Sequence, residues 1–227
     1  MSTILLRQLK KPKACFFDLD GTLEDSAYGI LKTIEYLCQK LEIIYPGDKK
    51  LRPFVGEGII SLLKLCDHTL SEEKLNQGFL WGLEYHRENA FKHTAIFSDV
   101  QALLEEIDQQ KIIWGIVTNK VRSIIEPSLK RLPFKPQNDL IICADDLRYA
   151  KPHPLPLIEI CQRAKIKPYE AIFIGDSVTD LKAAKSANVK AIFANYGYGN
   201  FNEAERLGFD ATINNLEELR QWLIFMK

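Results

Sequence analysis

The sequence lacks an excess of charge of either sign and lacks long apolar runs. Its 30 Lys and Arg residues balance its 30 Asp and Glu residues, so the formal net charge is zero. Composition therefore gives no general argument for nucleic acid or an anionic membrane as a partner, and we expect neither. The longest clean apolar run, Ile112 to Val117, is far too short to cross a bilayer.

Cysteines are few, and none are paired by spacing. The five residues Cys15, Cys38, Cys66, Cys143 and Cys161 are an odd number and include no Cys-x-x-Cys pair. This pattern argues against a disulfide framework or a zinc site and favours reduced core thiols. The first eleven residues also lack the apolar segment and cleavage site of a signal peptide. We expect a cytoplasmic protein, either a monomer or a homodimer.

Short apolar runs alternate with longer amphipathic stretches along most of the chain. Such runs are typical of strands buried on both faces, and their alternation with helices predicts βαβ units. The fold class expected is α/β: a Rossmann-like three-layer core with a parallel sheet. The predicted strands lie near 14–17, 112–117, 140–143, 171–174 and 190–194, and the predicted helices near 100–109, 122–131, 155–165 and 179–187.

One stretch interrupts this alternation. Leu23 to His93 contains no strand-like run, and its apolar residues recur at helical spacing. Ser71 is placed to cap a helix over 72–91. We therefore predict a discontinuous catalytic core of residues 1–23 and 94–227, with a small all-helical domain inserted at 24–93.

Polar side chains follow the predicted strands where each strand ends. Ligand sites in open parallel sheets form beyond the carboxyl ends of the strands, so these side chains are expected to share one rim. They are Asp18 and Asp20 after the first strand, Thr118, Asn119 and Lys120 after the second, Lys151 beyond the third, and Asp176, Ser177 and Asp180 after the fourth.

This set of residues suits phosphoryl transfer. Asp18, Asp20 and Asp176 offer the oxygen ligands that a hard divalent cation prefers. Magnesium fits better than zinc because the four histidines are dispersed. The cation and Lys151 would offset the charge of a phosphate dianion, and the Thr118 hydroxyl can donate to a phosphoryl oxygen.

Four motifs carry a resemblance to a known family. The segment Asp18-Leu19-Asp20-Gly21-Thr22-Leu23 resembles the first motif of the haloacid dehalogenase superfamily. Val117-Thr118-Asn119-Lys120, Lys151-Pro152 and Gly175-Asp176-Ser177-Val178-Thr179-Asp180 resemble its second, third and fourth motifs, in order. Each motif alone is short, but the ordered set is highly specific.

The resemblance implies a role for each of these residues. Asp18 would be the nucleophile and a magnesium ligand, and Asp20 the general acid and base, with its backbone carbonyl on the metal. Thr118, Asn119 and Lys151 would bind the phosphoryl group, and Lys151 would also hold Asp18. Asp176 would ligate magnesium. Asp180 and Ser177 would support the site, although Ser177 is equally well read as a simple helix cap.

The resemblance also implies the reaction. Dehalogenases of this superfamily have no aspartate at the position of Asp20, so its presence favours a phosphatase. Phe54 to Gly58, Ala144 to Leu147 and Tyr196 to Gly199 resemble segments of phosphoglycolate phosphatases. The insert at 24–93 resembles a helical cap that closes over the rim. The expected activity is Mg²⁺-dependent hydrolysis of a small phosphorylated metabolite, with 2-phosphoglycolate as one candidate.

Several alternatives stay open at this point. They are a phosphosugar mutase of the β-phosphoglucomutase type, another sugar-phosphate phosphatase and, more remotely, a non-catalytic phosphate-binding module, against which the intact set of motif residues argues. In the insert, Arg52 is a candidate ligand for a substrate carboxylate or phosphate, whereas His86 is expected on the surface. Glu24 departs from the family, which commonly has an apolar residue there.

Overall fold

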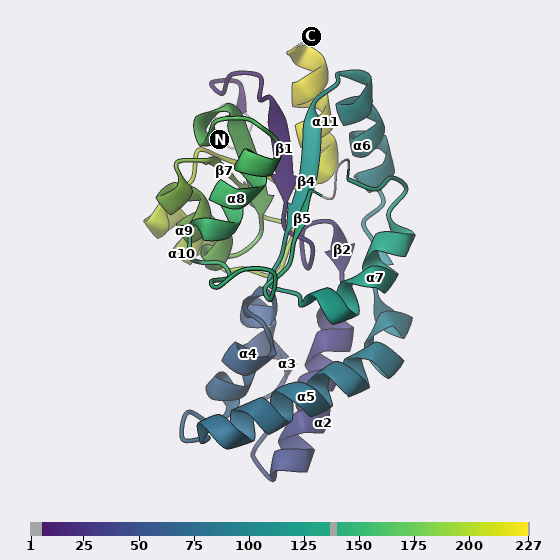
Figure 1. The fold of residues 1–227 in the computed structure, drawn as a ribbon, viewed down its shortest axis with the longest axis vertical. Helices are drawn as coiled ribbons and strands as arrows, with labels where there is room; N and C mark the ends of the chain where they lie inside the picture. The colour runs from purple at the N-terminus through teal and green to yellow at the C-terminus, as the bar shows by residue number, and fades with distance from the viewer. Residues whose placement is uncertain (1–5, 137–139, 227) are drawn as a thin grey trace.

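The computed structural model describes residues 6–136 and 140–226. Residues 1–5, part of the segment in which no signal peptide is expected, lie outside the described residues. Figure 1 shows two parts: a sheet flanked by helices, and a group of helices gathered at one end of it. In the described part of the chain, no helix is long and apolar enough to span a membrane.

The core contains a six-stranded parallel sheet. Its order is β5-β4-β1-β6-β7-β8, with β1 in the interior. The bounds are β1 Ala14–Phe17, β4 Ile113–Val117, β5 Ile141–Ile142, β6 Ala171–Gly175, β7 Lys190–Ala194 and β8 Ala211–Ile213. The predicted α/β class with a parallel sheet is confirmed.

Helices cover both faces of this sheet because alternate strand residues point to opposite faces. Cys15 and Phe17 join one apolar cluster, while Ala14 and Phe16 join the other. The first face is covered by α6 (Val100–Gln109), α7 (Arg122–Arg131) and α11 (Leu216–Phe225), and the second by α8 (Leu155–Arg163), α9 (Val178–Ala187) and α10 (Phe201–Leu207). A three-layer core results.

The insert is helical, as expected, and has an apolar cluster of its own. Its elements are α2 (Ala27–Leu41), α3 (Asp48–Leu51), η1 (Arg52–Glu57), α4 (Ile59–Cys66), α5 (Glu72–Asn89) and η2 (Ala90–His93). Gly78 and Gly82 let α5 approach its neighbours. A Cβ on Gly78 would lie 2.9 Å from Leu63 Cδ1, and one on Gly82 would lie 3.0 Å from Leu37 Cδ1. Ser71 Oγ accepts from the Lys74 N–H at 3.3 Å, as its predicted capping role requires.

Three short strands were not predicted. β2 (Glu24–Asp25) and β3 (Ala95–Ile96) pair antiparallel at the two ends of the insert. β8 adds a sixth strand at the sheet edge beyond β7. Strands of two or three residues leave no readable periodicity, so only their pairing partners reveal them.

Candidate active site

Asp18 lies directly after β1 and is paired with a buried lysine. Lys151 Nζ lies 2.8 Å from Asp18 Oδ1 and 2.7 Å from Asp180 Oδ1, and all three side chains are almost fully buried. Burial raises the pKa of Asp18 well above its ordinary value, and Asp180 adds to this effect while Lys151 opposes it. The lysine therefore bridges two carboxylates that come from different strand ends.

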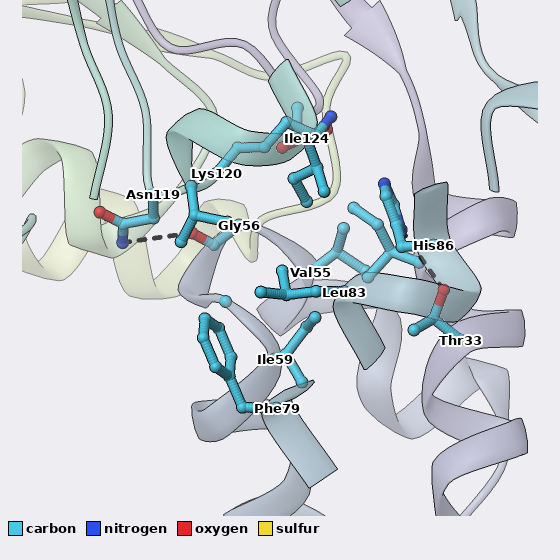
Figure 2. A pocket seen from close by; sticks show the side chains of 14 residues that line it. Thr33, Val55, Gly56, Ile59, Phe79, Leu83, His86, Asn119, Lys120 and Ile124 are labelled. Atoms are coloured by element: carbon cyan, nitrogen blue, oxygen red, sulfur yellow. Dashed lines mark hydrogen bonds and ion pairs between the residues drawn. The ribbon is translucent and has the colours of Figure 1, made fainter. Parts of the chain in front are cut away.

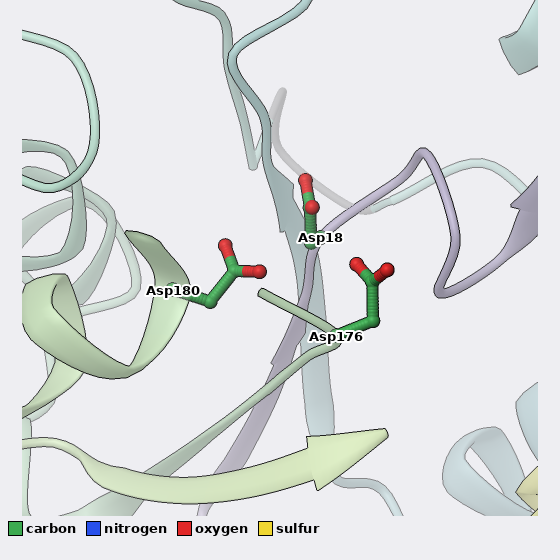
Figure 3. A group of neighbouring side chains, drawn as sticks. All are labelled: Asp18, Asp176 and Asp180. Atoms are coloured by element: carbon green, nitrogen blue, oxygen red, sulfur yellow. The ribbon is translucent and has the colours of Figure 1, made fainter. Parts of the chain in front are cut away.

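Asp176, at the end of β6, completes an acidic cluster with Asp18 and Asp180 (Figure 3). One carboxylate oxygen from each lies within 4.8 Å of the others. Asp176 Oδ2 accepts from the Tyr198 backbone N–H at 2.7 Å. Its Oδ1 is buried without a hydrogen-bond partner in the described part of the protein.

The electrostatics of this cluster fit a cation. Burial, together with the neighbouring charge of Asp180, raises the pKa of Asp176 to about 7. A bound cation would remove this cost by neutralising the carboxylates and would give the unpartnered Asp176 Oδ1 a ligand. The donors are all oxygens, which is the preference of a hard divalent ion.

Asp180 and Ser177 form a capping box at the start of α9. Ser177 Oγ accepts from the Asp180 N–H at 3.2 Å, and the Ser177 N–H donates to Asp180 Oδ2 at 3.0 Å. The Ser177 hydroxyl also donates to Asp180 Oδ2 at 2.6 Å. The helix cap read from the sequence at Ser177 is present. Through it, Asp180 is held against Lys151.

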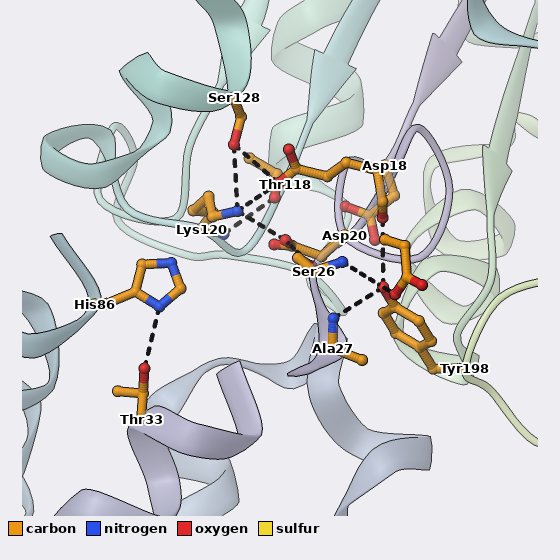
Figure 4. Close-up of polar contacts among 12 residues, drawn as sticks. Asp18, Asp20, Ser26, Ala27, Thr33, His86, Thr118, Lys120, Ser128 and Tyr198 are labelled. Atoms are coloured by element: carbon orange, nitrogen blue, oxygen red, sulfur yellow. Dashed lines mark hydrogen bonds and ion pairs between the residues drawn. The ribbon is translucent and has the colours of Figure 1, made fainter. Parts of the chain in front are cut away.

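Asp20 points away from the acidic cluster. Its Oδ1 accepts from Ser26 Oγ at 2.5 Å and from Lys120 Nζ at 2.7 Å (Figure 4). The group of three neighbouring carboxylates thus contains Asp180 in place of the Asp20 side chain expected from sequence. The resemblance assigned only the backbone carbonyl of Asp20 to the metal, and that contact stays a prediction.

Thr118 and Asn119 lie just beyond β4. Thr118 is buried, and its Oγ1 accepts from the Lys120 N–H at 3.1 Å, so its hydroxyl proton is available to a ligand. Asn119 Nδ2 donates to the Lys151 carbonyl at 3.0 Å and makes a longer bond of 3.4 Å to the Gly56 carbonyl. Asn119 therefore links the lysine loop to the helical insert.

Arg52, the candidate substrate ligand in the insert, is exposed. Its guanidinium carbon lies 5.0 Å from the centroid of the Tyr198 ring. The backbone N–H of Tyr198 donates to Asp176. Arg52 thus lies close to the rim without contacting the acidic cluster. Asp146, in the Ala144 to Leu147 segment that carries part of the resemblance, pairs with Arg122.

Two features were missed or misjudged from sequence. Lys120 was given no role, yet its Nζ is buried between Asp20 and Glu24, 2.6 Å from Glu24 Oε1. The unusual Glu24 was the sequence signal that could have revealed the role of Lys120, since a buried carboxylate needs a cation beside it. The prediction that His86 lies on the surface is wrong. Its side chain is buried because α5 packs on α2, where His86 Nδ1 lies 3.3 Å from Thr33 Oγ1.

Comparison with known proteins agrees with this geometry. Residues 15–194 match the family model of haloacid dehalogenase-like hydrolases. The chain is 32% identical to a phosphoglycolate phosphatase from Chromobacterium violaceum, over 93% of this chain and 96% of that protein. It is 26% identical to an N-acetylmuramic acid 6-phosphate phosphatase from Pseudomonas putida, over 92% of this chain and 95% of that protein.

A solved structure from Bacteroides fragilis, described as a haloacid dehalogenase-like hydrolase, superposes with a TM-score of 0.85. It is 25% identical to this chain and covers 92% of it, and the match includes all of that protein. The likeness extends over the core and the helical insert together. The motifs, the fold and these relatives agree, and the chain belongs to the haloacid dehalogenase-like hydrolase family.

Proposed function

We propose that this protein is a Mg²⁺-dependent phosphatase that cleaves a small phosphomonoester through an aspartyl-phosphate on Asp18. The observation that carries the proposal is the buried contact of 2.8 Å between Lys151 Nζ and Asp18 Oδ1, beside the acidic cluster. A carboxylate approaches a phosphate dianion only where positive charge offsets both. Asp18, Asp176 and the backbone of Asp20 would hold Mg²⁺, which supplies charge neutralisation at the phosphoryl oxygens when bound.

In the first step an oxygen of Asp18 forms a bond to phosphorus, and the bond from phosphorus to the alcohol oxygen breaks. Asp20 gives the leaving alkoxide a proton. Burial raises the pKa of Asp20, but the Lys120 charge and the hydrogen bonds that Asp20 receives from Lys120 and Ser26 act against it and leave the pKa below its ordinary value. A bound phosphate dianion raises the pKa of Asp20 again, because like charges disfavour ionisation.

In the second step water attacks phosphorus and gives a proton to Asp20, so that Asp18 and inorganic phosphate are released. Thr118 donates its free hydroxyl proton to a phosphoryl oxygen, and Lys151 balances the charge. Asn119 and Asp180 keep Lys151 in place. We include in the proposal that residues 24–93 act as a cap that shields the rim from water, and that Arg52 contacts the substrate at its edge.

Two substrate classes have support among the relatives. Similarity to phosphoglycolate phosphatases supports 2-phosphoglycolate as the substrate of this protein. Similarity to an N-acetylmuramic acid 6-phosphate phosphatase supports a sugar phosphate. A mutase would give an isomerised sugar phosphate without free phosphate, so measuring both products from a sugar 1-phosphate separates the two activities.

The test is release of phosphate from p-nitrophenyl phosphate and from 2-phosphoglycolate, with and without Mg²⁺. We expect Asp18→Asn to abolish release while the protein stays folded by circular dichroism. The matched control is Asp108→Asn, which changes an exposed aspartate on α6 and should keep wild-type rates. Mg²⁺-dependent turnover that survives in Asp18→Asn would contradict the mechanism.

A further inference from the structure

A pocket lies between the helical insert and the core, next to Asp20 (Figure 2). Most of its wall is apolar and comes from both parts of the chain. The apolar lining includes Ile30, Val55, Ile59, Phe79, Leu83 and Ile124. Because Asp20 is the proposed acid for the leaving alcohol, this pocket is where that alcohol would lie.

His86 enters this pocket from α5 with a defined tautomer. Thr33 Oγ1 donates its single proton to the Gly29 carbonyl at 2.9 Å. The contact of 3.3 Å between Thr33 Oγ1 and His86 Nδ1 therefore requires the ring nitrogen to be the donor. Burial lowers the pKa of His86 to about 4, so the ring is neutral at physiological pH. The proton is on Nδ1, and Nε2 carries a lone pair.

That Nε2 lone pair has no donor among the described residues. The His86 side chain is only 3% exposed, and its Nε2 is buried without a hydrogen-bond partner there. Figures 2 and 4 show Nδ1 turned toward Thr33 and the other side of the ring turned toward Lys120.

Lys120 does not donate a hydrogen bond to His86 Nε2, because its three ammonium protons already have acceptors. They go to Asp20 Oδ1 at 2.7 Å, to Glu24 Oε1 at 2.6 Å and, more weakly, to Ser128 Oγ at 3.5 Å. An acceptor that is buried, neutral and unpaired in a pocket is matched by a hydrogen-bond donor on a ligand.

We propose that His86 Nε2 accepts a hydrogen bond from a second hydroxyl group on the leaving alcohol, and that the preferred substrates are phosphomonoesters of diols with an otherwise hydrocarbon body. This inference rests on the proposed phosphatase function and narrows its substrate. A carboxylate such as that of glycolate is a poor fit, because its oxygens would face the His86 lone pair. Among the described lining residues, Lys120 is the only Lys or Arg, and two carboxylates already neutralise it.

The experiment compares kcat/KM for 2-hydroxypropyl phosphate and propyl phosphate, which differ only in one hydroxyl group, and for 2-phosphoglycolate. We expect the wild-type enzyme to favour the hydroxylated ester over both others by about tenfold or more. In His86→Phe the ratio between hydroxypropyl and propyl esters should fall toward one. His86→Gln, whose Oε1 can replace Nε2 as the acceptor, should restore part of the preference.

Two controls separate this role from a structural one. His93→Phe changes an exposed histidine in η2 and should keep the wild-type ratio. ¹⁵N NMR of the wild-type imidazole rings should give the Nδ1–H tautomer for His86, with a change at Nε2 when 2-hydroxypropyl phosphate binds to the Asp18→Asn protein. This second measurement does not depend on whether His86→Phe folds.

The inference is overturned if the wild-type enzyme prefers 2-phosphoglycolate, if its hydroxyl preference is absent or survives in His86→Phe, or if His86 carries its proton on Nε2. These outcomes leave the phosphatase assignment intact, because phosphate is still released. Failure to release phosphate from every ester, p-nitrophenyl phosphate included, contradicts the proposed function and the inference with it.

Discussion

Lys120 Nζ and Glu24 Oε1 form an ion pair of 2.6 Å in which both side chains are almost completely buried. Glu24 begins β2, on the strand pair that leads into the helical insert, and Lys120 follows β4 at the rim of the sheet. The same ammonium holds Asp20, so one lysine connects the base of the insert to the proposed general acid. Burial raises the pKa of Glu24, and Lys120 opposes that rise.

Replacing Lys120 with Met should destabilise the protein strongly. The change leaves two buried carboxylates without a cation, and breaking a buried pair in this way costs about 3–5 kcal/mol. The free energy of unfolding in urea measures the loss. Adding Glu24→Gln to Lys120→Met should recover part of it, since one unpaired charge is removed. Equal stability of the single and double variants would show that Glu24 does not depend on Lys120.

Mg²⁺ should stabilise the wild-type protein through Asp176. An ion that binds only the folded state adds about 2.7 kcal/mol at one hundred times its dissociation constant. Asp176→Asn removes the charge of a carboxylate whose Oδ1 has no partner among the described residues, so the Mg²⁺-dependent rise in Tm should largely disappear. Thermal melts with Mg²⁺ and with EDTA measure it, with Asp108→Asn as the control. An unchanged Mg²⁺ response in Asp176→Asn would place the ion elsewhere.

Gly197→Ala should disturb the same carboxylate through packing alone. A Cβ on Gly197 would lie 2.2 Å from Asp176 Cβ and 2.5 Å from its Oδ2, so Asp176 must move. We expect weaker Mg²⁺ binding and a loss of about 1–3 kcal/mol in stability from the overpacked site. Gly208→Ala, whose Cβ would meet no described atom within 4 Å, is the control for substitution itself. It should lose some stability through its positive φ and keep the Mg²⁺ response.

His86 should make stability depend on pH between about 4 and 6.5. Its folded pKa of about 4 lies below the ordinary value of 6.5. The unfolded chain therefore binds the proton more readily, and this contribution is present above pH 6.5 and lost as pH falls toward 4. Urea unfolding of the wild type and of His86→Gln should diverge in that window, with a flatter profile for the variant. Parallel profiles would mean that the buried ring titrates normally.

The helices of the core were predicted closely. Val100–Gln109 and Arg122–Arg131 have their expected bounds because each carries its apolar residues on one face. The third predicted strand, 140–143, is only Ile141–Ile142 in the structure. Strand ends depend on the partner strand, which local sequence does not reveal.

The order of the four motifs was enough to determine the family and the residues expected at the rim. This worked because a parallel sheet brings its carboxyl strand ends to one edge whatever the loops between them do. The direction in which each side chain points could not be predicted in this way. The Asp20 side chain lies with Lys120 and Ser26, and Asp180 lies in the acidic cluster, because the buried charges pair with the nearest opposite charges.

The pocket between the insert and the core was decided only by the tertiary structure. The sequence marked Glu24 as unusual and placed Lys120 in a motif, but neither fact revealed that the two side chains meet 2.6 Å apart. The burial of His86 likewise follows from the packing of α5 on α2, where its Nδ1 meets Thr33. Such contacts join residues that are tens of positions apart, and no local pattern encodes them. The place of Asp18 at the rim was therefore predictable from strand ends, whereas the pocket that we propose for the leaving alcohol depends on how the insert packs on the core.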